Sequence, residues 1–74
     1  MSQAWQDEWH YLVRLQDAAV ERSHRAQAEI SAAFRRRQPP TMQMLRAAAD
    51  AEEEVTSLKA QLRAFLERLS APNV

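Results

Sequence analysis

Residues 44–69 read MLRAAADAEEEVTSLKAQLRAFLERL, and their apolar side chains recur at alternating intervals of four and three residues. The recurring positions are Met44, Ala48, Ala51, Val55, Leu58, Leu62, Phe65 and Leu69. Residues at this spacing lie on one side of an α-helix, as in the heptads of coiled coils. The pattern therefore predicts a helix with a continuous apolar stripe, which needs a second helix to cover it.

The segment just before this helix predicts a turn. Residues 35–41 read RRRQPPT. Pro39 has no amide hydrogen to donate and disfavours a helical conformation at Gln38, so we expect a preceding helix to stop here. Either Thr41 caps the following helix or Pro40 is its first residue, and the sequence is compatible with both.

The predicted fold class is therefore all-α, a two-helix antiparallel hairpin of the coiled-coil type. We expect one domain over residues 1–74, with a first helix over about 3–36, a turn over 37–41, a second helix over about 42–70 and a tail over 71–74. The predicted seam between the helices contains Leu12, Val13, Ile30, Phe34, Val55, Leu58, Leu62, Phe65 and Leu69.

Charge placement supports the antiparallel arrangement independently of the apolar pattern. If the turn is centred between Pro39 and Pro40, the numbers of facing residues sum to about 79. Oppositely charged residues then meet along the whole length: Asp17 and Glu21 lie near Lys59 and Arg63, Arg22 and Arg25 near Glu52, Glu53 and Glu54, Glu29 near Arg46, and Asp7 and Glu8 near Arg68. Such exposed pairs fix the register more than the stability.

Composition argues against most kinds of chemistry. The 74 residues include no Cys and no Gly, which excludes disulfides, thiolate metal sites and glycine-rich phosphate loops. His10 and His24 are two heptads apart, or about 21 Å along a helix, which is too far to share a metal ion. Ser23 beside His24 lacks an oxyanion donor and a third catalytic group. We therefore expect no enzyme activity, cofactor or metal site.

Charge and hydropathy also indicate which partners to expect. Ten basic residues balance ten acidic ones, so no overall field draws the chain to nucleic acid. The basic run Arg35, Arg36 and Arg37 is accounted for by the end of a helix, where cations are favourable. The chain begins without the pattern of a secretory signal and has no apolar run of the ~20 residues that span a bilayer. We expect a cytoplasmic protein with no membrane association.

Both helices have more apolar width than one seam uses. We expect the surplus to bind a partner through Trp5, Trp9, Tyr11, Leu15, Leu45 and Leu66. The alternative is that these residues only broaden the seam. Gln16, Ser23 and Gln27 weaken the middle of the seam, so the hairpin alone is expected to be marginally stable.

One region resembles a known family. Residues 34–45, FRRRQPPTMQML, are followed by an Ala-rich start of the second helix, and this order is similar to the turn region of the YscE/PscE family of type III secretion needle co-chaperones. The resemblance covers about 20 of the 74 residues. It implies a cytosolic helical hairpin that pairs with a larger helical-repeat chaperone, the two together keeping an export substrate soluble.

Two other functions remain open from the sequence. The chain has the size of homodimeric four-helix-bundle regulators, similar to small RNA-binding plasmid regulators. It could also be a small inhibitor that occupies a groove of a host protein. In each case the chain is a binding module whose partner is a protein or a second copy of itself.

Overall fold

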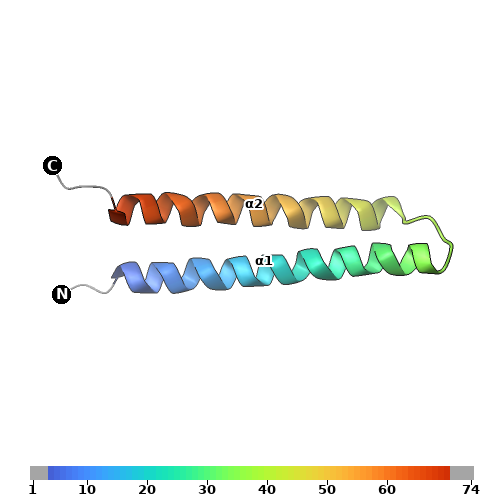
Figure 1. Ribbon diagram of the computed structural model, residues 1–74, viewed down its shortest axis with the longest axis horizontal. Helices are drawn as coiled ribbons and strands as arrows, with labels where there is room; N and C mark the ends of the chain where they lie inside the picture. The colour runs from blue at the N-terminus through green and yellow to red at the C-terminus, as the bar shows by residue number, and fades with distance from the viewer. Residues whose placement is uncertain (1–3, 71–74) are drawn as a thin grey trace.

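The computed structural model describes residues 4–70 and consists of two helices joined by one turn (Figure 1). α1 spans Ala4–Arg35 and α2 spans Met42–Ser70. The helices run antiparallel, side by side over their whole length. The predicted all-α hairpin is confirmed, and the tail expected over 71–74 lies outside the described residues.

The hairpin is long and thin, with extents of 59 × 20 × 15 Å. Its radius of gyration is 17.2 Å, whereas a compact globule of this length would have about 11 Å. A two-layer rod has no interior beyond the seam between its helices. Every side chain outside that seam therefore faces outward, toward solvent or toward a partner.

The best packed part of the seam lies near the open end of the hairpin. Leu12, Leu62 and Phe65 form a buried cluster against which Trp9 and Val13 pack. The Trp9 and Phe65 rings stack with centroids 5.9 Å apart and planes inclined by 28°. This cluster supplies most of the large buried side chains, so it is expected to dominate the stability of the hairpin.

Toward the turn the seam becomes a line of small side chains. Ala19, Ser23, Ala33 and Ala51 are buried there, and Leu58 is the one large buried side chain of this part among the described residues. Ser23 is satisfied by Gln27, whose Nε2 donates to its Oγ over 3.4 Å. Small residues bury little apolar area, so the seam is weaker from its middle to the turn than at the open end.

Two residues expected in the seam are exposed, and this corrects the sequence prediction. Phe34 is 63% exposed and Leu69 is 48% exposed. Successive helical residues are about 100° apart, so with Ala33 facing α2 the next side chain, Phe34, points to one side. Leu69 lies in the last turn of α2, where the seam runs out. Of the other seam residues, Leu12, Leu58, Leu62 and Phe65 are buried, and Val13, Ile30 and Val55 are half-buried.

α1 ends through a left-handed residue placed before the prolines. Arg37 has a φ of 58°. Its amide donates to the Phe34 carbonyl over 3.0 Å, and the amide of Gln38 donates to the Ala33 carbonyl over 2.9 Å. This is the Schellman pattern that satisfies the last carbonyls of a helix. The helix therefore stops at Arg35, slightly earlier than the prolines alone predict.

α2 begins with a side-chain cap. The amide of Met44 donates to Thr41 Oγ1 over 3.1 Å, and the amide of Leu45 donates to the Thr41 carbonyl over 3.1 Å. Thr41 is therefore the N-cap and Met42 the first helical residue, which decides between the two alternatives that the sequence left open. Such a cap contributes about 1 kcal/mol.

Replacing Arg37 by glycine is expected to stabilise the hairpin by about 0.5–1 kcal/mol. A side chain at positive φ is strained, and glycine removes that strain at a smaller cost in chain entropy. The same change at Arg14, an exposed residue in the interior of α1, is the matched control and should destabilise by about 0.5–1 kcal/mol. Urea unfolding followed by circular dichroism measures both. Equal destabilisation by the two variants would contradict this description of the turn.

Candidate interaction surface

The polar side chains of residues 4–70 lie mostly on the exposed surface of the hairpin. Within residues 4–70, no group of three or more His, Cys, Asp or Glu side chains is arranged to hold a metal ion. His10 and His24 are both exposed, and Ser23 is buried in the seam next to Gln27. Neither of the two helices is long and apolar enough to cross a membrane. The features left to examine are the two broad faces of the hairpin.

One broad face, the charged face, is built from two heptad stripes joined by ion pairs. Its stripes are Glu8, Leu15, Arg22 and Glu29 on α1 and Ala47, Glu54, Gln61 and Arg68 on α2. Arg22 pairs with Glu54, and Arg68 pairs with Glu8 over 3.3 Å. Residues seven apart share a helix face, so these two contacts place both stripes on the same side. Four of the five charged residues in these stripes are therefore paired with each other, and Glu29 has no ion pair within residues 4–70.

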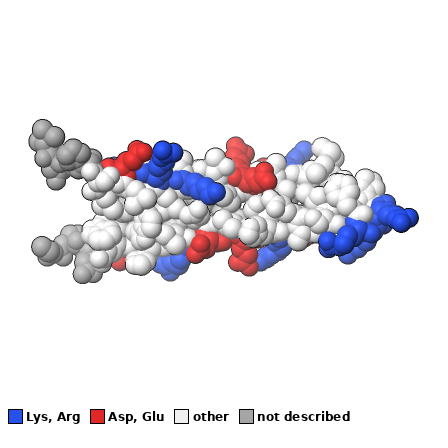
Figure 2. All heavy atoms as spheres, in the orientation of Figure 1, with Lys and Arg blue, Asp and Glu red and all other residues white. Residues whose placement is uncertain are grey.

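The opposite broad face, which we name the uncharged face for its apolar ends although Glu52 and Lys59 lie in its middle, is built the same way from different stripes. They are Val13, Val20, Gln27 and Phe34 on α1 and Leu45, Glu52, Lys59 and Leu66 on α2. Gln27 Nε2 donates to Glu52 Oε1 over 3.2 Å, which places the two stripes next to each other. Figure 2 shows uncharged surface toward both ends of the hairpin, with acidic and basic side chains between them and basic side chains at the turn itself.

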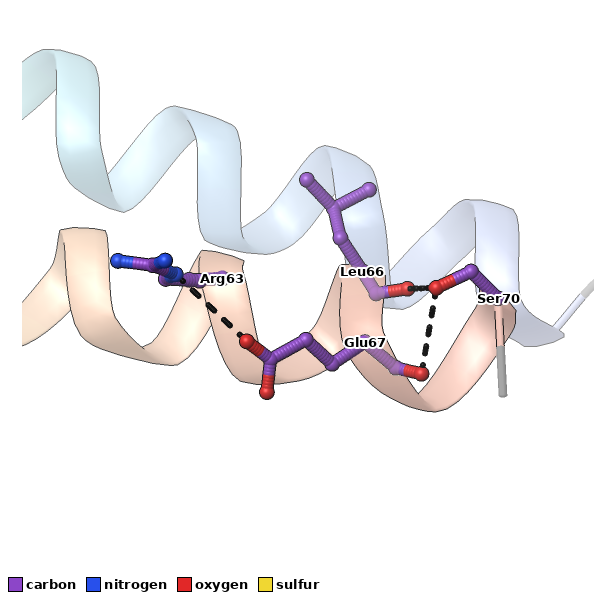
Figure 3. Close-up of polar contacts among 4 residues, drawn as sticks. All are labelled: Arg63, Leu66, Glu67 and Ser70. Carbon is purple, nitrogen blue, oxygen red and sulfur yellow. Dashed lines mark hydrogen bonds and ion pairs between the residues drawn. The ribbon is translucent and has the colours of Figure 1, made fainter.

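The apolar side chains of the uncharged face gather at its two ends. At the turn end Phe34 is 63% exposed and Leu45 is 43% exposed. At the open end Leu66 is 49% exposed, and the half-buried Val13 belongs to the neighbouring stripe of the same face. Figure 3 shows the isobutyl group of Leu66 extending from α2 on the side of α1, while Arg63 and Glu67 pair along α2 over 3.6 Å. Two apolar patches are thus separated by a polar middle.

The residues expected to bind a partner are spread over several surfaces of the hairpin. Leu45 and Leu66 belong to the uncharged face, but Leu15 belongs to the charged face and Tyr11 lies on its rim. Trp9 packs into the seam cluster against Phe65, so most of its ring is used within the hairpin and is not available to a partner.

Trp5, also expected to bind a partner, is 47% exposed near the start of α1. It therefore remains available at the open end of the hairpin. The expected set is divided between the two broad faces, the seam and this open end.

Phe34 lies on the surface of the hairpin, although the sequence prediction assigned it to the seam. It carries the most exposed aromatic ring of the described residues. A signal for it was present in the sequence, because Val13, Val20 and Phe34 fall in one heptad frame beside the seam frame. Two features hide this second row of apolar residues in the sequence. Gln27 interrupts the row, and either Ala33 or Phe34 could occupy the same position of the seam.

The observed ion pairs match part of the predicted set. Glu54 with Arg22 and Glu8 with Arg68 form as expected. Glu21 instead pairs with Arg25 over 2.9 Å along α1. All these side chains are about half exposed or more, so each pair contributes only ~0–1 kcal/mol.

Basic side chains gather at the turn end of the hairpin in Figure 2, where Arg35, Arg36 and Arg37 lie. All three are exposed. The backbone around them is engaged in ending α1, and Arg37 itself is the left-handed residue. Their placement at a helix C-terminus agrees with the electrostatic reason given for them from the sequence.

The accessible surface of the hairpin is large for its mass. It measures 6189 Å², whereas a folded monomer of 8.5 kDa would expose about 4,650 Å². The difference of roughly 1,500 Å² exceeds the ~800 Å² that each partner contributes to a standard interface. Comparisons of the chain with protein-family models, with curated proteins and with solved structures found no match.

Proposed function

We propose that this protein is a helical binding module, and not an enzyme, that uses its uncharged face to bind another helical protein. The observation that carries the proposal is the pair of adjacent stripes with large exposed apolar side chains at both ends. A groove between two helices receives the apolar side of a third helix by the same packing that joins the first two.

The energy of such binding should come from few residues. Phe34, Leu45 and Leu66 are each 43–63% exposed and have apolar area left to bury. A few large side chains that become fully buried in a contact carry most of its binding free energy. The ion pairs of the charged face leave less to gain there, because desolvating paired charges is costly.

The more specific form of the proposal is a type III secretion needle co-chaperone in the cytoplasm. Its support is the resemblance of the turn region, residues 34–45, to the YscE/PscE family. In that form the uncharged face binds a helical-repeat chaperone, and the pair keeps an export substrate soluble. A homodimeric RNA-binding regulator and an inhibitor of a host protein are the alternatives, and each predicts a different captured molecule.

A capture experiment with two matched variants tests the proposal. The full chain, Leu66→Glu and Gln61→Glu serve as bait in native cell extract, with and without nuclease, and bound proteins are identified by mass spectrometry. Both substitutions add one negative charge to the open-end half of α2, but Leu66 is on the uncharged face and Gln61 on the charged face. Both sites are exposed, so both variants should remain helical.

We expect one helical protein to be captured by the wild type and by Gln61→Glu, and at least about tenfold less by Leu66→Glu. A helical-repeat chaperone or a needle subunit as the captured protein would support the secretion form. RNA that is retained and lost on nuclease treatment would support the regulator instead. Capture that depends on Gln61 and not on Leu66 would overturn the assignment of the binding face.

A further inference from the structure

We infer that in the isolated protein the uncharged face is covered by the same face of a second copy of this chain, turned end for end, so that two hairpins form a four-helix bundle. The inference rests on the proposed function, because it names an occupant for the same face. It is drawn from the symmetry of the apolar and charged positions along the two stripes.

The two apolar patches are placed for self-complementary contact. Val13 and Phe34 are three heptads apart on α1, and Leu45 and Leu66 are three heptads apart on α2, so both spans measure about 31 Å. Turning a second copy end for end therefore puts its open-end patch on the turn-end patch of the first, and the reverse. The two copies are related by a two-fold axis that lies in the plane of contact, perpendicular to the helices and at the middle of the face. Two-fold dimers are the commonest class of homo-oligomer.

The charges between the patches obey the same symmetry. On α2, Glu52 follows Leu45 by one heptad and Lys59 precedes Leu66 by one heptad. The rotation that places Leu45 against Leu66 of the second copy therefore also places Lys59 against Glu52 of the second copy. By symmetry, Glu52 of the first copy lies against Lys59 of the second, so the dimer has two such ion pairs. Lys59 makes no ion pair within residues 4–70, so its ammonium group is available for this contact.

The other two-fold arrangement, with both turns at the same end, lacks this agreement. It would place α1 of one copy over α2 of the other, with Lys59 on Val20 and Glu52 on Gln27. Apolar patches would still meet, but neither charge would find an opposite charge. Pairs of opposite charges across an interface determine how the two partners are oriented, even where the pairs add little affinity.

The available area is sufficient for such a dimer. The hairpin is 59 Å long and 20 Å wide, so one face is larger than the ~800 Å² per partner of a standard interface. Pairing of the charged faces is disfavoured, since Arg22 with Glu54 and Arg68 with Glu8 are already satisfied within each chain.

Sedimentation equilibrium from micromolar to millimolar concentration tests the inference with a charge-reversal series. The full chain is compared with Lys59→Glu, with Glu52→Lys and with the double variant that carries both changes. We expect a dimer for the wild type and a dissociation constant raised by about tenfold or more in each single variant, because each places two like-charged pairs in the contact. The double variant should restore dimerisation to within about threefold of the wild type.

Scattering measurements on the same samples should give a dimer no longer than the monomer, as face-to-face packing requires. A chain that stays monomeric up to millimolar concentration would overturn the inference. So would a dimer indifferent to both reversals, or single variants that the double variant does not rescue. If the chain is monomeric yet captures a helical protein in a Leu66-dependent manner, the self-association fails while the proposed function stands.

Discussion

Replacing Phe65 by alanine is expected to unfold the hairpin, with a loss of about 3–5 kcal/mol of unfolding free energy. Phe65 is 2% exposed and lies at the centre of the cluster with Leu12 and Leu62. A rod with a single seam has no second layer that could move in to fill the cavity. A small domain of this size has only a few kcal/mol of total stability to lose.

The matched control for this change is Leu69→Ala, one helical turn further along α2. Leu69 is 48% exposed, so its loss should cost less than about 1 kcal/mol. Urea titrations followed by circular dichroism compare the two variants at equal protein concentration, because association would add to apparent stability. If Phe65→Ala lost no more than Leu69→Ala, the cluster would not be the core of the fold.

Replacing Trp9 by alanine is the second change with a large expected effect, about 2–3 kcal/mol, whereas Trp5→Ala should cost about 1 kcal/mol or less. The two indoles lie one helical turn apart but differ in surroundings. Trp9 stacks on Phe65 with centroids 5.9 Å apart, while Trp5 is 47% exposed. Stacked aromatic pairs contribute about 0.5–1.5 kcal/mol beyond their buried area.

Urea unfolding of the two tryptophan variants gives the direct comparison. A double-mutant cycle between Trp9 and Phe65 then isolates the ring contact, and we expect a coupling energy of at least about 0.5 kcal/mol. If Trp5→Ala were the more destabilising variant, Trp5 and not Trp9 would be the core residue, and this prediction would be wrong.

The architecture could be predicted from the sequence because two strong local signals agree. The uninterrupted heptads of residues 44–69 require a covering helix, and Pro39 and Pro40 end the helix that precedes them. The ends of both helices lie within one or two residues of the predicted positions. The way α1 ends could not be predicted, because a left-handed Arg37 without glycine has no distinctive residue signal.

The ends of the seam and the binding surface were harder to predict for one physical reason. A heptad repeat corresponds to 3.5 residues per turn, but a straight α-helix has 3.6. The apolar stripe therefore rotates by about 20° per heptad away from the partner helix. Near the turn this drift decides whether Ala33 or Phe34 faces α2, and the structure selects Ala33. Surplus apolar residues such as Leu15 and Leu66 then fall on opposite faces, which a count of apolar residues does not reveal.

Two aromatic side chains allow the uncharged face to be tested against the charged face in a single sample. Phe34 is 63% exposed on the uncharged face, and Tyr11 is 58% exposed on the rim of the charged face. Hydroxyl-radical labelling read by mass spectrometry is applied at low and high protein concentration, and again in the presence of the captured partner. We predict that association protects Phe34 severalfold and leaves Tyr11 unchanged, whichever molecule covers the face. Protection of Tyr11 with unchanged labelling of Phe34 would contradict the assignment of the uncharged face as the binding surface.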